Sequence, residues 1–499
     1  MADFFDGKVT IGGSDKLFIG GAWMDPSSDA RIELVSPVTE RPVGAVAAAA
    51  SADVDRAVAA ARQAFDEGPW PRMTAAERGP FLARLADALT ARHQELSHAW
   101  TGQMGITFPF AEVATTSSIA LAQFQADHAD RYSWDEPRPT YYPGSVGRIV
   151  REPVGVVAAI APWNAPLFSM IIKLAPALVA GCTVIMKPAP ETPLEAYILA
   201  ECVETAGFPP GVINLIAAER EVSDYLVRHP GVDKVSFTGS SATGKRIAAV
   251  CADRIARVTL ELGGKSAAIV LADMDLDEAA SILAPSLTAL SGQVCSNLTR
   301  YLVPRDRQAD FVGAMAARLA AIRVGDPYEA GVGMGPLAMA RQLDRVQGYV
   351  DRGLAEGAKL VTGGRRPPQL NRGYFFEPTL FCDVDNRSTI AREEIFGPVA
   401  CVTPYESLDD AVRLANDTPF GLAGAIFTHD PDAAYAVGRR LRAGTVSQNG
   451  LKPDFNIAFG GFKESGIGRE GGVEAVLPYL ETKTMILDAP VSRGPEGGA

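Results

Sequence analysis

Between residues 154 and 262 the sequence alternates short apolar runs with longer amphipathic ones, and this alternation limits the possible folds more than any other feature. The apolar runs are VGVVAAIAP, CTVIMKP, GVINLI, DKVSFTG and RVTLELGG, with a helical pattern between neighbours. Strands and helices that alternate at this spacing form βαβ units, which build a parallel sheet with helices on both faces. An α/β fold is therefore predicted, and a second α/β series is expected from about 263 to 460.

Composition excludes several classes of partner. The 47 Lys and Arg residues against 59 Asp and Glu give a formal charge of −12, which argues against nucleic acid or a membrane surface. The first residues lack a secretion signal, and no apolar run is long enough to cross a bilayer. The six cysteines form no C-x-x-C pair, so we expect a cytoplasmic setting. The five scattered histidines predict no metal site.

One cysteine differs from the rest in its surroundings. Cys295 lies in the polar, turn-like segment SGQVCSNLTR, whereas the others lie in or beside apolar runs: Cys182, Cys202, Cys251, Cys382 and Cys401. A buried cysteine behaves as a small hydrophobic residue, and an accessible one in polar company can be a nucleophile. From the residues alone, both interpretations of Cys295 stay open.

Two polar residues follow or end apolar strands, where parallel sheets bind their ligands. Glu261, in LELGGKS, is a candidate general base if partly buried, or a solvated glutamate at a strand end. Asn164, in APWNAP, is a candidate donor to an oxyanion, or a residue that only stabilises its own turn.

The stretch FTGSSATGKR has most of a phosphate-binding loop. It has Arg246 where an ATP-binding loop of this type needs a Ser or Thr for Mg²⁺, so an ATPase is disfavoured. Glycines before a helix still allow backbone N–H groups to approach a phosphate. A turn without a ligand remains the alternative.

Together these segments resemble the aldehyde dehydrogenase superfamily. PWN, KPAPETP, FTGSSATG, LELGGKS, GQVC, EEIFGP, PFGLAG and GGFKESGIGRE follow one another in the family's order, over about residues 17–487. The resemblance implies that Cys295 attacks an aldehyde, that Asn164 holds the oxyanion and that Glu261 activates water. It also implies that Lys173 and Glu470 relay protons and support the site.

The resemblance further implies a binding site for NAD, with NADP as an alternative. Lys187 would meet the adenosine ribose, Ser240 the pyrophosphate and Glu394 the nicotinamide ribose. The expected cofactor contacts are Ile160, Ala161, Pro162, Trp163, Lys187, Ala189, Pro190, Phe237, Thr238, Gly239, Ser240, Gly244, Leu262, Gly263, Glu394 and Phe396.

Several positions depart from the family pattern. Pro190 stands where members that prefer NAD usually have a Glu, so the choice between NAD and NADP stays open. Thr288 and Leu290 replace an aromatic residue and an Asn that are frequent there. The expected substrate-pocket residues are Phe168, Ile172, Phe455 and Phe459, so we expect hydrophobic aliphatic, terpenoid or aromatic aldehydes as substrates.

The resemblance also implies a fold with two Rossmann-like parallel-sheet domains plus a strand arm for oligomerisation. The cofactor-binding domain would comprise 1–130 and 152–262, the catalytic domain 263–465, the arm 131–151 and 466–490, and a tail 491–499. Such an arm implies a homodimer or homotetramer. Two other functions stay open: a relative that transfers the acyl group to coenzyme A, and a non-catalytic binding protein on the same fold.

Overall fold

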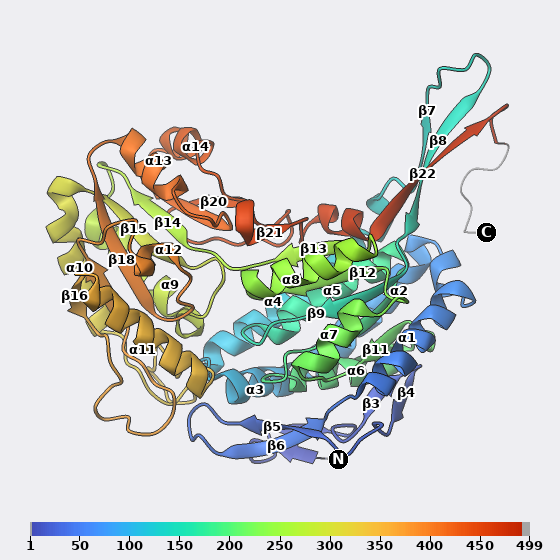
Figure 1. The fold of residues 1–499 in the computed structure, drawn as a ribbon, viewed down its shortest axis with the longest axis horizontal. Helices are drawn as coiled ribbons and strands as arrows, with labels where there is room; N and C mark the ends of the chain where they lie inside the picture. The colour runs from blue at the N-terminus through green and yellow to red at the C-terminus, as the bar shows by residue number, and fades with distance from the viewer. Residues whose placement is uncertain (1, 492–499) are drawn as a thin grey trace.

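The apolar runs of residues 154–262 form the centre of an eight-stranded sheet in the computed structural model, which describes residues 2–491. Part of the predicted tail, 492–499, lies outside the described residues. The central strands are parallel, in the order β13-β12-β9-β10-β11 (Figure 1). Their bounds are β9 (Val156–Ile160), β10 (Thr183–Lys187), β11 (Ile213–Leu215), β12 (Lys234–Thr238) and β13 (Arg257–Glu261). The predicted α/β fold is confirmed.

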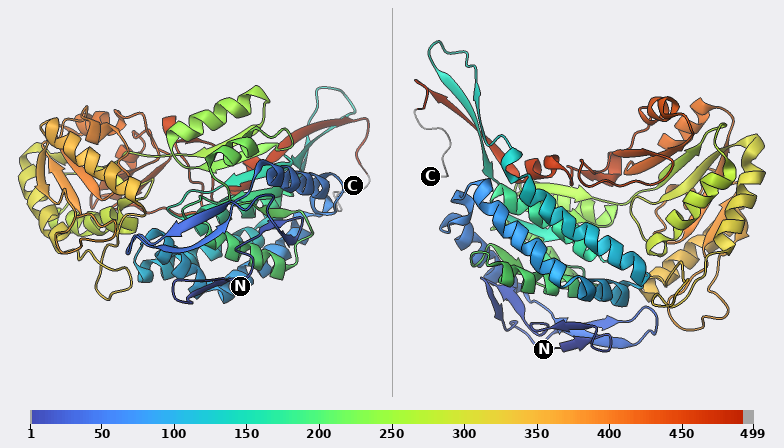
Figure 2. Two further views of the ribbon diagram at one scale, coloured as in Figure 1. Left: turned by 60° about the horizontal axis from the view of Figure 1, so that its bottom comes forward. Right: turned by 180° about the vertical axis from the view of Figure 1, so that it is seen from behind.

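Helices cover both faces of this sheet. On one face lie α5 (Pro166–Ala180) and α6 (Leu194–Ala206), which end at Gly181 and Gly207 with positive φ. On the other lie α1 (Ser51–Asp66), α7 (Arg220–Arg228) and α8 (Ser241–Asp253). An outer layer, α2 (Ala75–Ala91) and α4 (Phe108–Asp127), packs against α5 and α6 (Figure 2).

The N-terminal residues extend the first lobe. The hairpin β3 (Leu17–Ile19) and β4 (Ala22–Met24) joins the sheet beside β11, and separate two-stranded sheets pair β1 (Ala2–Phe4) with β2 (Val9–Ile11) and β5 (Arg31–Val35) with β6 (Pro42–Ala47). Helix α3 (His93–Met104) was not predicted from the sequence, because Ser97, Thr101 and Gln103 interrupt its apolar pattern. All three are nevertheless buried.

The second lobe contains a seven-stranded sheet in the order β16-β17-β18-β15-β14-β19-β20. The pairs are parallel apart from β16 with β17. The strands are β14 (Ser266–Val270), β15 (Leu298–Pro304), β16 (Lys359–Thr362), β17 (Thr379–Cys382), β18 (Val399–Tyr405), β19 (Ala423–Phe427) and β20 (Thr445–Gln448).

The sequence patterns identify only β14 and β20 of these strands. β15 starts within the segment that reads as a polar turn and has Arg300 in its middle. The guanidinium is buried and donates to the carbonyl oxygens of Lys265 (3.0 Å) and Ala415 (2.8 Å). A charged residue is therefore tolerated inside this strand because tertiary contacts satisfy its donors.

The helices of the second lobe agree better with the sequence patterns. The apolar patterns predict helices at 276–290, 308–322, 340–357, 407–418 and 431–444. All five occur, although the last, α14, ends earlier than its pattern, and the short α12 is additional. Their bounds are α9 (Leu276–Thr288), α10 (Gln308–Ala320), α11 (Ala340–Ala355), α12 (Thr389–Arg392), α13 (Leu408–Asn416) and α14 (Pro431–Gly438).

A three-stranded antiparallel sheet projects from the first lobe (Figure 1). It consists of β7 (Asp135–Arg138), β8 (Val146–Pro153) and β22 (Leu480–Leu487). The short β21 (Gly466–Ile467), by contrast, pairs with β13 at the edge of the eight-stranded sheet.

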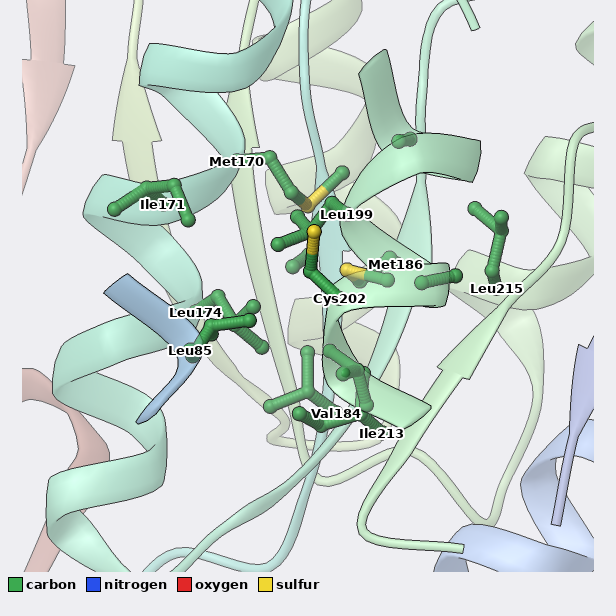
Figure 3. Close-up of a cluster of buried hydrophobic side chains, with 14 of the residues drawn as sticks. Leu85, Met170, Ile171, Leu174, Val184, Met186, Leu199, Cys202, Ile213 and Leu215 are labelled. Atoms are coloured by element: carbon green, nitrogen blue, oxygen red, sulfur yellow. The ribbon is translucent and has the colours of Figure 1, made fainter. Parts of the chain in front are cut away.

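Cys202, at the interface between α6 and the sheet, is an example of a cysteine that packs as an apolar core residue, unlike Cys295 (Figure 3). Cys202 is 2% exposed and lies in one apolar cluster with Met170, Met186 and Leu199. Cys182, Cys251 and Cys401 are also buried, whereas Cys382 and Cys295 are partly exposed, and all six are free thiols.

Replacing Cys202 with Ser should destabilise the protein by about 1–3 kcal/mol, because a hydroxyl would be buried without a partner. Cys382→Ser, at a partly exposed site, should change stability by less than about 0.5 kcal/mol. Thermal unfolding monitored by circular dichroism compares the two variants. Equal melting temperatures would contradict the assignment of Cys202 to the core.

Candidate active site

The register of the first sheet brings four predicted site residues to one edge. Lys187 pairs with Ile160, and Thr238 pairs with Glu261, at the carboxyl ends of β9, β10, β12 and β13. This edge opens on a cavity of about 1620 Å³ that residues from both lobes line. In a parallel sheet, this is the edge where ligands bind.

The link from the first sheet to the second crosses the cavity at two glycines. A Cβ at Gly263 would lie 2.2 Å from Oε2 of Glu394, and a Cβ at Gly264 would lie 2.6 Å from the carbonyl oxygen of Cys295. The backbone N–H of Gly264 donates to Oε1 of Glu394 (3.1 Å). Only glycine allows the chain to pass this close to both segments.

Cys295 lines the cavity and is partly exposed. Burial raises the pKa of its thiol to about 12, and the negative charges of Glu394 and Glu261 contribute further. The resting cysteine is therefore a protonated thiol, which becomes a strong nucleophile only when a base removes its proton.

Glu261 also lines the cavity, at the end of β13. Glu261 is 3% exposed, and neither of its carboxyl oxygens has a hydrogen-bond partner within residues 2–491. Burial raises the pKa of Glu261 well above its usual range; the charge of Glu470 also raises it, and Lys173 and Arg469 oppose the shift. A raised pKa makes this carboxyl group a stronger base once it is deprotonated.

Asn164 lies on the same cavity between β9 and α5. Its side-chain Nδ2 donates to the backbone carbonyl oxygen of Gln293 (2.9 Å), and its backbone carbonyl oxygen accepts from Nε1 of Trp100 (3.0 Å). One amide N–H is thus held by the backbone of the segment that carries Cys295.

A buried ion pair lies next to Glu261. Nζ of Lys173 contacts Oε1 of Glu470 and donates to Oγ1 of Thr238 (2.6 Å). Lys173 is fully buried and does not line the cavity, whereas Glu470 and Thr238 do. A charged pair with hydrogen-bonded ends connects the cavity wall to the interior of α5.

Most of the predicted cofactor residues lie along the first-sheet side of the cavity, whereas Glu394 and Phe396 line it from the second lobe. All of them line it apart from Gly244, where a Cβ would instead meet Leu262 Cδ2 at 2.5 Å. Ser240 is the N-cap of α8 and accepts from the N–H of Thr243 (3.3 Å). Burial lowers the pKa of Lys187 to about 8, although the charges of Glu191 and Glu219 raise it.

Three predicted substrate-pocket residues form an aromatic wall. Phe455 packs against Phe168, with ring centroids 4.5 Å apart, and against Phe459, at 4.9 Å. All three line the cavity. Ile172 does not: it is 4% exposed and lies in the hydrophobic core of the first lobe. Its assignment to the pocket is therefore not supported by its position.

Other cavity residues carried no signal in the sequence. Phe110 and Val113 on α4, and Gln342 and Arg345 on α11, line the cavity. Nε2 of Gln342 donates to the carbonyl oxygen of Phe396 (2.6 Å), and Nε of Arg345 to that of Ile395 (3.1 Å), so α11 holds the segment with Glu394. These positions follow no motif, and only the packing of the helices brings them here.

Comparison with solved structures identifies the class of protein. An aldehyde dehydrogenase of Mycobacterium tuberculosis, complexed with NAD+, superposes with a TM-score of 0.93 at 42% identity, covering 97% of this chain and 100% of that one. A mutant aldehyde dehydrogenase C of Pseudomonas syringae, complexed with NAD+ and octanal, gives 0.92 at 39% identity over 97% and 99%. The fold is that of the aldehyde dehydrogenases.

The sequence comparisons agree with this class. The profile of the aldehyde dehydrogenase family matches residues 23–485. The geranial dehydrogenase of Castellaniella defragrans is 45% identical over 472 residues, which span 94% of this chain and 98% of the relative. The chain belongs to the aldehyde dehydrogenase family and is an enzyme that oxidises aldehydes.

The raised pKa of Cys295 predicts how its thiol reacts in the free enzyme. Its alkylation by iodoacetamide should accelerate about tenfold per pH unit from about pH 8 to about pH 10, because each unit increases the thiolate fraction tenfold below the pKa. Glu394→Gln, which removes a nearby negative charge, should speed the reaction at pH 8 about threefold. Mass spectrometry of the labelled peptide, with Cys295→Ala as the control, measures both. A rate that levels off below about pH 9 would contradict the prediction.

Proposed function

We propose that the chain oxidises apolar aldehydes to carboxylic acids through a covalent intermediate on Cys295, with NAD as the oxidant. The observation that carries this proposal is that Cys295, Glu261 and Asn164 line one cavity. A nucleophile, a base and an oxyanion donor are the three groups that acyl chemistry needs.

The first-sheet edge fits a dinucleotide. It offers the N-terminus of α8 for phosphates and the cavity-lining Lys187 for a ribose, and the second lobe offers the carboxyl group of Glu394 for a second ribose. When bound, NAD accepts the hydride from the carbon that Cys295 holds. The relatives solved with NAD+ support this choice over NADP. Pro190 lacks the carboxylate that members preferring NAD usually have at this position. The next residue, Glu191, has one, and it pairs with Arg341, which lines the cavity.

Acylation begins when Glu261 takes the thiol proton of Cys295. The sulfur forms a bond to the aldehyde carbon, and the carbonyl oxygen becomes an oxyanion. The free N–H of the Asn164 amide and the backbone N–H of Cys295 stabilise that charge. Loss of hydride from the same carbon leaves a thioester on Cys295.

Deacylation uses the same base. After the thiol proton has left Glu261, the carboxylate takes a proton from water, the water oxygen attacks the thioester carbon, and the carbon–sulfur bond breaks to release the acid and the Cys295 thiolate. The proton on Glu261 must then leave a buried site. Glu470, Lys173 and Thr238 form the polar route next to it.

The substrate side of the cavity favours hydrophobic aldehydes. Phe168, Phe455 and Phe459 form its wall, and Phe110 and Val113 extend the apolar lining toward solvent. The geranial dehydrogenase among the relatives and the octanal complex of another support terpenoid and aliphatic aldehydes as substrates.

We further infer that the lobe with the eight-stranded sheet binds the cofactor and that the lobe with the seven-stranded sheet supplies Cys295. The projecting sheet of β7, β8 and β22 has open edges that suit pairing with another subunit in a homodimer or homotetramer. No helix within residues 2–491 is long and apolar enough to span a bilayer. The six free thiols support a cytoplasmic setting.

Two variants separate the steps of this mechanism. Cys295→Ala should lose both the initial burst of NADH and steady turnover, at least about a thousandfold. Glu261→Gln should slow steady turnover about a hundredfold or more, because water is no longer activated. Its first turnover should also slow, because the thiol of Cys295 loses its base, but it should remain measurable. Stopped-flow NADH fluorescence measures both phases. A steady rate that coenzyme A accelerates would favour the acyl-transferring alternative instead.

The pH profile provides a related test of Glu261. Because its pKa is raised, the deprotonated form is gained only as pH increases, so wild-type kcat should rise with pH above the usual range of a carboxyl group. Glu261→Gln should lose this dependence, while Glu394→Gln, which leaves the base intact, should keep it. A flat wild-type profile would contradict the role of Glu261.

The apolar wall predicts the substrate range. Initial rates with geranial, octanal and benzaldehyde should give kcat/KM at least about tenfold above that of succinic semialdehyde, since an apolar pocket offers the charge no partner. The same series with NAD and NADP tests the choice of oxidant. Preferential oxidation of succinic semialdehyde, with octanal inert, would be incompatible with this pocket.

A further inference from the structure

We propose that Gln293 is a positioning residue for the reaction: it holds the segment before Cys295 so that its own carbonyl group orients the amide of Asn164. This inference rests on the proposed function, because it concerns how the oxyanion donor is aimed. It assigns a role to the glutamine of the GQVC segment, which lies two residues before Cys295.

The chain reaches Cys295 through an unusual backbone conformation. Leu290, Ser291 and Gly292 have φ values of 48°, 55° and 76°, so three successive residues adopt the left-handed region. Residues with a side chain are disfavoured there, and neighbouring contacts must hold them. Gly292 has no room for any other residue, because a Cβ would lie 2.3 Å from the carbonyl carbon of Gly397.

Gln293 closes this turn with both its backbone and its side chain. Its backbone N–H (3.0 Å) and its Nε2 (2.9 Å) donate to the carbonyl oxygen of Leu290, and its Oε1 accepts from the N–H of Ala338 (3.1 Å). The residue is 0% exposed. A primary amide has both a donor and an acceptor at this length of side chain, whereas Met has neither and Glu lacks the donor when ionised.

The carbonyl group of Gln293 then makes the contact that matters for the reaction. It accepts from Nδ2 of Asn164 at 2.9 Å. The two N–H bonds of a primary amide lie in one plane, so fixing one of them fixes the direction of the other. The second N–H of Asn164 is the oxyanion donor of the proposed mechanism, and Asn164 and Cys295 line the same cavity.

Ser291 offers a matched control in the same turn. Its Oγ donates to the carbonyl oxygen of Gly335 (3.0 Å), it is 3% exposed, and no hydrogen bond joins it to Asn164 among residues 2–491. Ser291→Ala therefore removes a buried hydrogen bond from the left-handed turn without removing a bond of Gln293. A purely structural turn would respond alike to Ser291→Ala and Gln293→Met.

The experiment compares Gln293→Met, Ser291→Ala, Asn164→Ala and the double variant with Gln293→Met and Asn164→Ala. For each variant it measures the NADH burst rate constant, the dissociation constant of NAD and the melting temperature. Gln293→Met should lower the burst rate roughly tenfold to a hundredfold, part of the effect of removing an oxyanion donor. The NAD constant should stay within about twofold, and Ser291→Ala should lower the burst rate by less than about threefold. In the Asn164→Ala background, Gln293→Met should have little further effect.

Three outcomes overturn the inference: equal burst rates for Gln293→Met and wild type, equal losses for Gln293→Met and Ser291→Ala, or full additivity with Asn164→Ala. If Gln293→Met does not fold, Gln293→Glu replaces it, since it keeps the acceptor for Ala338 and loses the donor to Leu290. Failure of the proposed function would give a different result. A burst that persists in Cys295→Ala would mean that Cys295 is not the nucleophile, whatever the effect of Gln293→Met.

Discussion

The site depends on the close approach of three chain segments at Gly263 and Gly264. The strand that ends at Glu261 continues through these glycines into the second sheet, and they pass within van der Waals contact of Glu394 and of the backbone at Cys295. A side chain at either position would push the lobes apart or displace one of these residues. Because the glycines have no side chains, the carboxyl ends of the first-sheet strands can lie opposite the start of the second sheet across a shared cavity.

Burial determines the electrostatics of that cavity. The same removal from water raises the pKa values of Cys295, Glu261 and Glu394 and lowers that of Lys187. For Glu394 the value reaches about 7, with the N–H of Gly264 opposing the shift. Burial thus disfavours the charged form of each of these groups. Lys173 and Glu470 lie beside them as an ion pair.

The first sheet could be predicted from the sequence almost strand by strand, and the second could not. β9 to β13 are nearly continuous apolar runs, because helices bury both faces of the sheet. β15 carries Arg300, and α3 carries buried polar residues, so their patterns resemble loops. Arg300 and Gln103 form tertiary hydrogen bonds with partners far away in the sequence, such as Lys265 and Glu195. Ser97 instead donates to the carbonyl oxygen of His93 within its own helix. The site residues divide in the same way. The ordered motifs indicate Cys295, Glu261 and Asn164 as site residues. Ile172, by contrast, lies in the core of the first lobe and not on the cavity, and the cavity residue Arg345 belongs to no motif.

The sequence by itself determined the parallel α/β class, the family and the candidates for the reactive residues, because apolar periodicity and ordered motifs are local properties of the chain. The tertiary structure alone decided which polar groups are buried without partners, which helix faces line the cavity and how the amide of Asn164 is directed. Those properties depend on contacts between segments more than a hundred residues apart, such as Asn164 with Gln293. Asn164 and Gln293 come within hydrogen-bond distance only once both lobes have folded around Gly263 and Gly264.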